Sequence, residues 1–343
     1  MSSYILKLRE LINNPERLDN SLEWVFLDNA EPPNILIYGE RLGLEALKTP
    51  NFKAVDLFKY WRVLAQAPEG HLEAMEIYFD RAPTILHGEQ HFAARRFFSP
   101  TYRRIEKDFH NWIDSFTEDF FNAHNQIDKI NPLCLARDYV QKVTSRIIAQ
   151  DLNVEAHELP YMPGEVLQMM TTLKALEEYN QRLNVLVDFI QRKLKISGRN
   201  PDEAWAIVST TVMGTEPLLA ALVFALMLPT NDLVSWDSER LMSESKPISV
   251  LGREAVCDFE ISNMLFKKGQ KVQVTTDLIR NPSVNLKSPQ QTIPFGIGVH
   301  ICPGKKISLI VADAFLIKWA NTKEMHSKLN RVEFFRDFVL RAK

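Results

Sequence analysis

The chain has 343 residues, of which 24% are charged, and a formal net charge of -2 at pH 7. A net charge this close to zero does not favour a nucleic-acid-binding protein, so we expect no nucleic-acid partner. Three cysteines in a chain of this length are too few for a disulfide framework and indicate a reducing, cytoplasmic compartment. Since no Gly/Ser-rich or Pro-rich linker divides the sequence, we predict one domain over residues 1–343.

Two apolar segments bear on whether the chain enters a membrane. Met1 to Asn13 alternates apolar with charged residues, which is typical of an amphipathic helix and not of a signal peptide. The longest apolar run, Leu218 to Leu228, lies between Pro217 and Pro229 and is shorter than the about 20 residues that a membrane-spanning helix needs. We therefore expect no membrane anchor.

Helical periodicity dominates the middle of the chain. The pattern predicts helices over Glu89–Phe98, Arg103–Ala123, Pro132–Gln150, Gly164–Leu173, Leu176–Ile196, Asp202–Leu228 and Lys305–Ala320. The helix from Asp202 has the clearest start, because Asn200 can cap it and Pro201 suits the first helical position.

Strand-like segments cluster late in the chain. Alternating or β-branched residues predict strands over Pro247–Leu251, Glu254–Ile261, Met264–Phe266 and Lys271–Thr276, with a turn at Lys267–Gln270. The expected fold class is therefore mainly α with a small β-sheet region.

The loop Pro-Phe-Gly-Ile-Gly-Val-His-Ile-Cys-Pro-Gly, Pro294 to Gly304, precedes the last predicted helix. Gly296, Gly298 and Gly304 would permit positive φ angles and a close approach of the backbone to a sulfur atom. An ordinary glycine-rich turn with a buried cysteine is the alternative for any single residue of the loop. A zinc site is weaker, because the other cysteines, Cys134 and Cys257, are distant in sequence and no Cys-x-x-Cys pair exists.

This loop resembles the haem-binding signature of the cytochrome P450 superfamily, Phe-x-x-Gly-x-x-x-Cys-x-Gly. The matching residues are Phe295, Gly298, Cys302 and Gly304, and His300 matches a frequent partner of a haem propionate. The resemblance implies a haem b cofactor, Cys302 as the axial ligand of the iron, and a shortened form of the cytochrome P450 fold.

Further positively charged or titratable residues match propionate-binding positions of the same family. His91 and Arg95 stand four residues apart, so one helix face can direct both to the same anion. Arg253 resembles the propionate-binding arginine of the family's small sheet. The alternative for each residue alone is a solvated surface charge, but with His300 they make four candidates for two carboxylates.

The long helix from Asp202 resembles the family's central helix, with its Ala-Gly-x-Asp/Glu-Thr segment. The corresponding residues are Met213 to Pro217, so Gly214 and the acid Glu216 match while Pro217 replaces the alcohol. Proline removes a backbone donor and predicts a kink in the helix. The resemblance implies proton delivery by Glu216, with Thr215 or Thr211 as a substitute hydroxyl; a structural role for the Glu216 carboxylate is the alternative.

A second departure concerns the family's Glu-x-x-Arg pair, which should fall at Glu239 to Met242. The arginine has become Met242, and the family's later arginine is absent from Asn285–Gln291. Because a buried unpaired carboxylate is costly, we expect Glu239 to face solvent or to have another partner.

The resemblance implies a haem-thiolate oxidoreductase, a monooxygenase that oxidises a small organic molecule in specialised metabolism. A ferredoxin or flavodoxin would supply electrons at a basic face that includes Lys305 and Lys306. Two alternatives stay open: a peroxide-dependent or non-oxygen-activating haem-thiolate enzyme, indicated by Pro217, and a degenerate partner-binding or haem-sensing module, indicated by Met242.

Overall fold

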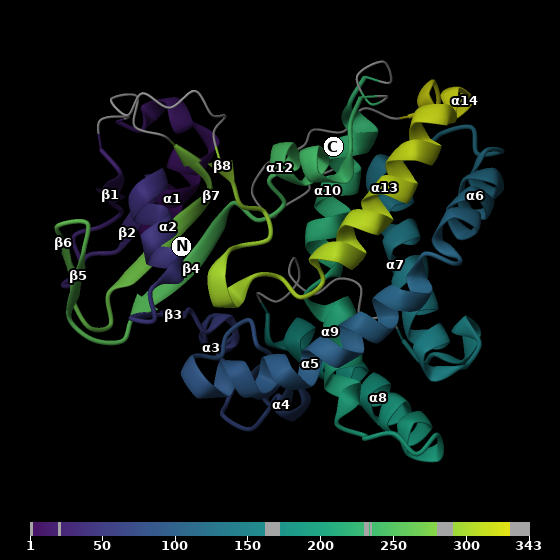
Figure 1. Cartoon of the computed structure of the whole chain (residues 1–343), viewed down its shortest axis with the longest axis horizontal. Helices are drawn as coiled ribbons and strands as arrows, with labels where there is room; N and C mark the ends of the chain where they lie inside the picture. The colour runs from purple at the N-terminus through teal and green to yellow at the C-terminus, as the bar shows by residue number, and fades with distance from the viewer. Residues whose placement is uncertain are drawn as a thin grey trace. The chain divides into compact units, whose positions relative to one another are not determined.

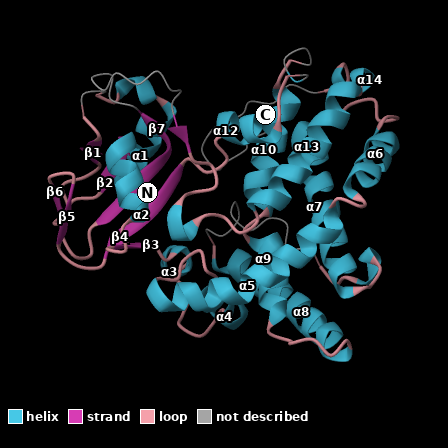
Figure 2. Ribbon diagram, in the orientation of Figure 1, coloured by secondary structure: helices cyan, strands magenta, loops and turns pink. Residues whose placement is uncertain are grey.

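The computed structural model describes residues 3–19, 22–161, 172–229, 233, 235–279 and 291–329. They form two compact units: Met1–Asp56, Pro83–His91 and Ile248–Cys302 make the first, and Leu57–Ala82, Phe92–Pro247 and Pro303–Lys343 the second. Strands gather in the first unit and helices build the second (Figure 1, Figure 2). We call them the sheet unit and the helical unit. The single domain expected over residues 1–343 stays a prediction.

The main sheet has the strand order β1-β2-β7-β4-β3, with β8 paired to β7. β2 and β7 run parallel and the other neighbours are antiparallel. A separate hairpin pairs β5 with β6. The strands are β1 (Trp24–Phe26), β2 (Ile35–Gly39), β3 (Phe52–Ala54), β4 (Val250–Ala255), β5 (Phe259–Ile261), β6 (Met264–Phe266), β7 (Lys271–Ile279) and β8 (Gln291–Thr292).

Helix α2 (Glu40–Lys48) packs on β2 and β7 and closes the core of the sheet unit. Leu42 and Leu47 on this helix are buried with the inward residues of the two strands. Phe52 adds an aromatic cluster, with its ring centroid 4.9 Å from that of Phe259 and 5.1 Å from that of Phe266. The burial of aromatic and aliphatic side chains is the main stabilising term here.

The strands expected late in the chain are present as β4 to β7, although Glu254 and Ala255 belong to β4 and not to the strand after it. The turn at Lys267–Gln270 is confirmed, since the Gln270 amide donates to the Lys267 carbonyl at 2.9 Å. Gly269 in this turn has a φ of +81°. Strands β1, β2, β3 and β8 were not predicted. β1, β3 and β8 have only two or three residues, and the five residues of β2 are all buried and so do not alternate.

The helical unit contains most of the helices of the described residues. They are α3 (Leu57–Leu64), α4 (Glu73–Arg81), α6 (Ile113–His124), α7 (Pro132–Leu152), α8 (Leu173–Ile196), α9 (Glu203–Val212), α10 (Thr215–Met227), α12 (Ser238–Ser245), α13 (Lys305–Asn321) and α14 (Lys323–His326). Of these, α3, α4, α12 and α14 were not predicted. Helix α5 (Gly88–Phe109) joins this unit from Phe92 onward. The N-terminal helix α1 (Ser3–Asn13), in the sheet unit, confirms the predicted amphipathic helix.

Helix boundaries differ from the prediction at three places. The helix expected over Arg103–Ala123 is interrupted, because α5 ends at Phe109 and α6 begins at Ile113. The break expected between Phe98 and Arg103 is absent, because α5 continues through Pro100 to Phe109. The single kinked helix expected over Asp202–Leu228 is two helices, because α9 ends at Val212 and α10 begins at Thr215. Most of the helix predicted over Gly164–Leu173 lies outside the described residues.

Within the described part of the chain, the stretch Glu203–Met227, taken as one helix of 25 residues, is long and apolar enough to cross a membrane. However, 59% of its most apolar window is buried inside the protein. Burial of this kind is typical of the core helix of a water-soluble protein, so length and composition are weak evidence for a membrane span.

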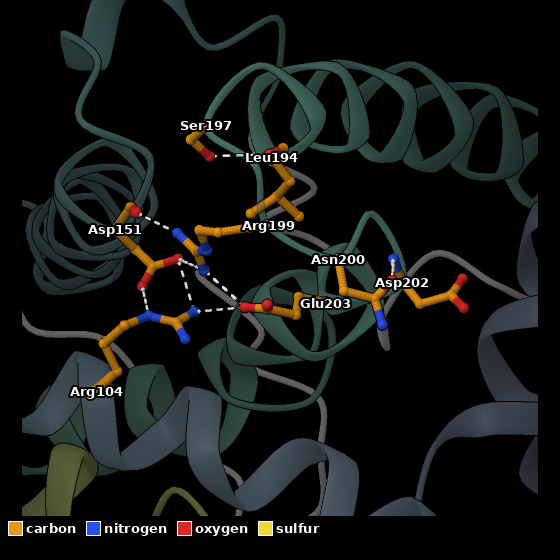
Figure 3. A network of polar contacts seen from close by, with 8 residues as sticks. All are labelled: Arg104, Asp151, Leu194, Ser197, Arg199, Asn200, Asp202 and Glu203. Carbon is orange, nitrogen blue, oxygen red and sulfur yellow. Dashed lines mark hydrogen bonds and ion pairs between the residues drawn. The ribbon is translucent and has the colours of Figure 1, made fainter.

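A network of two arginines and two carboxylates fixes the start of α9 (Figure 3). Arg104 on α5 contacts both carboxylate oxygens of Asp151 on α7, at 2.6 and 3.2 Å. Arg199 donates to the same carboxylate at 2.9 Å and to the Asp151 carbonyl at 2.7 Å. Both arginines also donate to Glu203, at 3.0 and 2.8 Å. Three helices are thereby joined at one point.

We expect Asp151→Asn to lower the free energy of unfolding by about 2–4 kcal/mol, measured by urea denaturation. The Asp151 side chain is 2% exposed, and its loss as an anion would leave two arginines short of a charge partner. Breaking a fully buried ion pair typically costs about 3–5 kcal/mol. We expect a somewhat smaller loss here, because the side chains of Arg104 and Arg199 are 37% and 23% exposed and water can solvate them.

The matched control is Glu178→Gln, which makes the same change from carboxylate to amide. Glu178 lies 3.9 Å from Lys174 and is 56% exposed, so we expect a change below about 0.5 kcal/mol. Equal effects of the two substitutions would contradict a special role of Asp151.

Candidate functional site

The cysteine loop lies at the end of the sheet unit and is closed by its own backbone. The Cys302 amide donates to the Phe295 carbonyl at 2.9 Å, and the Gly296 amide donates to the Ile293 carbonyl at 2.9 Å. Gly296 and Gly298 have φ angles of +67° and +66°, which confirms the predicted left-handed backbone at both. The side chains of Phe295 and Cys302 are half-buried.

Gly304 does not share this conformation, so the positive φ expected there was wrong. Its φ is -88° and its ψ is 6°, and it caps the N-terminus of α13. Many residue types reach these angles. A role for Gly304 in the haem-binding signature stays a prediction.

Gly298 lets the loop lie against the last turn of α2. A Cβ atom at Gly298 would lie 3.6 Å from the Leu47 carbonyl oxygen and 3.8 Å from the Cα atom of Lys48. The next residues form a short 3-10 helix, η3 (Gly298–His300), and Ile297 packs against the core of the sheet unit. The sheet unit therefore holds the loop that carries Cys302.

The sheet unit also brings together three of the predicted propionate partners. The ring centroids of His91 and His300 are 4.3 Å apart, although the two residues are more than 200 positions apart in sequence. Arg253 on β4 is close enough to His300 for its charge to lower the pKa of the imidazole. The grouping of His91, His300 and Arg253 is the arrangement that the sequence predicted.

Arg253 is a buried cation with no ion pair among the described residues. The residue is 6% exposed, and its Nη1 atom donates to the Gly252 carbonyl at 2.9 Å. Burial lowers the pKa of the guanidinium to about 10. Since buried charges in proteins normally have a partner, this site fits the carboxylate of an anionic group such as a haem propionate.

His300 is held in its neutral form beside this cation. Burial first, and then the charges of Arg253, His91 and His87, lower the pKa of His300 to about 3, while a hydrogen bond to the Pro83 carbonyl opposes this shift. Its Nδ1 atom is buried without a hydrogen-bond partner in the described part of the chain. Sequence analysis missed His87 and Pro83, which no motif marks.

Arg95 lies one helical turn after His91 on α5 and is half-buried. It belongs to the helical unit, as do Gly304, Gly214, Thr215 and Glu216. The structure thus groups His91, Arg253, Phe295, Gly298, His300 and Cys302 in the sheet unit. The roles predicted for all these residues stay predictions.

The break between α9 and α10 has two local causes. Pro217 has no amide hydrogen to donate to the Met213 carbonyl, so the hydrogen-bond ladder of the helix is interrupted. A Cβ atom at Gly214 would lie 2.4 Å from the Thr210 carbonyl oxygen, which only glycine avoids at this position. The predicted kink is thus present, as a turn at Met213–Gly214, and Pro217 itself lies in the first turn of α10.

This turn presents the two candidate proton-transfer residues at the start of α10. Thr215 is the first residue of the helix and is 3% exposed, while Glu216 follows it and is half-buried. The chain keeps right-handed helical angles through the turn, with φ -107° and ψ -15° at Met213 and φ -94° and ψ -27° at Gly214. Faces of α9 and α10 therefore stay in approximate register.

The prediction for Glu239 is confirmed. Its side chain is 72% exposed and lies 3.5 Å from Lys305, whereas Met242, at the position of the missing arginine, is 2% exposed. Lys306 pairs with Glu106 on α5. Both lysines of the expected basic face thus have carboxylate partners. These partners reduce the positive potential with which the face could attract an acidic electron-donor protein.

The described residues contain no cluster of three or more His, Cys, Asp or Glu side chains that could hold a metal ion. Cys134 and Cys257 are both exposed. A single cysteine that ligates the metal of a bound cofactor does not need such a cluster.

Comparison with known proteins gives a structural match without a sequence match. No protein-family model matches the chain, and no curated protein matches it significantly. Among solved structures, the chain is similar to P450BioI in complex with an acyl carrier protein ligated to hexadec-9Z-enoic acid. The TM-score is 0.68 with 16% identity, over 94% of this chain and 92% of that one.

Two further structures give the same result. The cytochrome P450 PksS of the Bacillus subtilis bacillaene polyketide synthase matches with a TM-score of 0.69 and 13% identity, over 100% of this chain and 96% of that one. Epothilone B-bound cytochrome P450epoK matches with a TM-score of 0.67 and 15% identity, over 93% and 90%. Mainly α with a small sheet, the chain has the cytochrome P450 fold, as predicted.

We expect Arg253→Met to leave the free energy of unfolding of the haem-free protein within about 1 kcal/mol of the original value. The substitution removes one hydrogen bond to a carbonyl but also removes the cost of burying an unpaired cation. The control is Arg199→Met, which leaves two carboxylates short of a partner and should cost about 2–3 kcal/mol. A comparable loss for Arg253→Met would show that its charge is already paired within the chain.

Proposed function

On the basis of the cytochrome P450 fold, we propose that this chain is a haem-thiolate oxidoreductase, a monooxygenase that oxidises a small organic molecule. The observation that carries the proposal is the buried cation Arg253 beside His91 and His300, in the same unit as Cys302. A protein that had lost its cofactor would gain stability by replacing that cation with an apolar residue. Its presence supports an anionic cofactor bound next to the cysteine loop.

In this proposal haem b, when bound, supplies the oxidation chemistry through an iron with a thiolate ligand. Cys302 is the thiolate, because its loop is closed by the hydrogen bond to Phe295 and turned by Gly296 and Gly298. Arg253, His91 and His300 would bind the propionates, and Arg95, on the same helix as His91, is the fourth candidate. Neutral His300 uses its one N–H on the Pro83 carbonyl. A propionate beside it would favour the protonated imidazole, whose second nitrogen could then donate to the carboxylate.

Glu216 and Thr215 are the proposed proton-transfer residues. The turn at Met213–Gly214 places them at the N-terminus of α10, where the helix dipole stabilises the Glu216 carboxylate. Thr215 can pass a proton through its hydroxyl group, since a hydroxyl both donates and accepts. Pro217, which replaces the family's alcohol, cannot take part in such transfer.

The substrate class in this proposal is a small organic molecule of specialised metabolism. Support comes from the names of the similar structures, which include a cytochrome P450 of a polyketide synthase and one bound to epothilone B. A carrier protein is a second kind of partner to consider, because one similar structure is a complex with an acyl carrier protein. A ferredoxin or flavodoxin remains the proposed electron donor, and the cytoplasm the proposed location.

We expect the dithionite-reduced protein, purified with haem supplied, to show a Soret band at about 450 nm when carbon monoxide is added. Cys302→Ser should abolish this band, because the position of the band depends on the thiolate ligand. Cys134→Ser and Cys257→Ser are matched controls and should keep it, since both residues are exposed. Arg253→Met should keep the band position and lower the haem content.

Loss of haem by a stably folded protein would contradict the proposal. That result would favour the degenerate partner-binding or haem-sensing module, for which Met242 is the indication.

A peroxide-dependent enzyme is the second candidate, favoured by Pro217 at the position of the family's proton-delivering alcohol. Peroxide already carries the two electrons and the protons that dioxygen activation must collect, so a peroxide-dependent enzyme needs less proton delivery from the protein.

We expect Glu216→Gln to separate the two candidates. In a monooxygenase it should lower substrate turnover driven by a ferredoxin system by about 100-fold, the lower end of the effect of a proton-transfer residue. In a peroxide-dependent enzyme, hydrogen peroxide should drive turnover while the ferredoxin system does not, before and after the substitution. Turnover with both oxidant systems is measured on the same preparation, with Glu239→Gln, an exposed acid, as the control.

A further inference from the structure

Helices α12 and α13 pack against each other in the helical unit, and two polar contacts join them. The Oδ1 atom of Asp313 on α13 accepts a hydrogen bond from the amide of Ser238, the first residue of α12, at 2.8 Å. Lys305, the first residue of α13, lies 3.5 Å from the Glu239 carboxylate. Both contacts engage the first two residues of α12, so they attach the N-terminus of α12 to α13.

The Asp313 contact is the stronger of the two. Ser238 is 3% exposed and Asp313 is half-buried, whereas the side chains of Lys305 and Glu239 are 42% and 72% exposed. Water and salt screen an exposed pair of this kind, so it contributes little. A carboxylate that accepts from a backbone amide at a helix N-terminus makes a charge-assisted hydrogen bond, and the helix dipole stabilises its charge.

Other contacts hold the start of α12 without reaching α13. Asp237 caps the helix by accepting from the Arg240 amide at 2.7 Å. The Trp236 ring centroid lies 6.1 Å from that of Phe224 on α10, and the Arg240 guanidinium lies 4.4 Å from the Trp236 centroid. Asp237 and Asp313 therefore accept the same kind of hydrogen bond at the same helix end, but only Asp313 links that end to another helix.

The buried face of α12 gives little directional information. Leu241 and Met242 on this face are 0% and 2% exposed. Met242 stands at the position where the family has an arginine, and its thioether has no charge and is a weak acceptor. A methionine side chain is flexible and fills space without specifying one geometry. Directional contacts such as the Asp313 hydrogen bond therefore set the orientation of α12 against α13.

Helix α13 begins directly after the cysteine loop. Only Pro303 and Gly304 separate Cys302 from this helix, and Gly304 is its N-cap. The ring of Pro303 fixes its φ angle, which limits the freedom of this connection. On the other side, the Cys302 amide is bonded to the Phe295 carbonyl. A displacement of the start of α13 is consequently passed on to Cys302.

We propose that Asp313 is a positioning residue for Cys302. Through the first turn of α12 it holds α13, and α13 holds the end of the cysteine loop where the sulfur can ligate the haem iron. The inference deepens the proposed function, on which it rests for the role of Cys302 as a ligand. Asp313 does this in a chain whose Met242 supplies no ion pair.

The first test is the carbon monoxide difference spectrum of the dithionite-reduced, full-length protein with haem supplied. We expect Asp313→Ala to raise the ratio of bound haem without the band at about 450 nm to bound haem with it by about 3- to 10-fold, the equilibrium effect of one hydrogen bond. The matched control is Asp237→Ala, which should leave this ratio unchanged. Asp313→Asn should retain the original ratio, because its amide oxygen still accepts.

The second test needs no haem. In a protein that carries Cys134→Ser and Cys257→Ser, Cys302 is the only cysteine left for iodoacetamide to alkylate. We expect Asp313→Ala to raise the alkylation rate by about 3- to 10-fold, because the loop opens locally more often. Asp237→Ala should leave the rate unchanged. The urea midpoints of the two alanine variants should fall by similar amounts, which excludes a general loss of stability as the cause.

The outcomes separate this inference from the proposed function. A faster alkylation in Asp313→Ala, in a protein that shows no band at about 450 nm, would overturn the proposed function alone. The band in the original protein, with equal ratios and equal rates for Asp313→Ala and Asp237→Ala, would overturn this inference alone and leave Asp313 as an ordinary helix cap. If Asp313→Ala does not fold, Asp313→Ser, whose side chain is too short for this hydrogen bond, takes its place.

Discussion

The helical unit depends on one buried carboxylate, that of Asp151. Two arginines from different parts of the chain bond to it, and both also bond to Glu203 in the first turn of α9. A charge network of this kind is weak as a source of stability but strong as a constraint on geometry, because any displacement leaves a buried charge unpaired. It fixes where α9 begins, and hence the position of Ser209 on α9 and of the turn at Gly214 that follows it.

Helix α9 ends because of two residues that follow it, Gly214 and Pro217. The Thr210 carbonyl oxygen lies so close to Gly214 that a Cβ atom there would clash with it. Pro217 has no amide hydrogen, so the Met213 carbonyl lacks its usual helical donor. The two effects occur three residues apart and act on the same turn. Pro217 stands at the position that matches the family's alcohol, so no side-chain hydroxyl is present there. The nearest groups that can transfer a proton are the Thr215 hydroxyl and the Glu216 carboxylate, in the first turn of α10.

The sheet unit shows a different constraint, an excess of positive and titratable groups. The charges of Arg253, His91 and His87 all lower the pKa of His300, and the described residues provide no carboxylate to pair with Arg253. A sheet that buries a cation in this way is stable only because hydrophobic burial elsewhere is large, as in the core formed by α2 with β2 and β7. The resulting field favours an anion, which is a property of the unit as a whole and not of any single residue.

Sequence alone determined the cysteine loop, the positive φ angles at Gly296 and Gly298, the start of a helix just after Pro201 and the exposed position of Glu239, because each follows from local backbone chemistry or from the cost of burying charge. It was wrong where contacts with other segments decide the structure. Gly304 has an ordinary conformation, α5 continues through Pro100, β1 and β3 are too short to show a pattern, and β2 is buried along its whole length and so does not alternate. Only the tertiary structure brought His87 and Pro83 to His300, joined Arg104 to Asp151, and placed the Tyr78 hydroxyl 3.0 Å from the Oγ atom of Ser209. Contacts between residues distant in sequence carry no periodic signal, since the packing of whole helices and strands sets them.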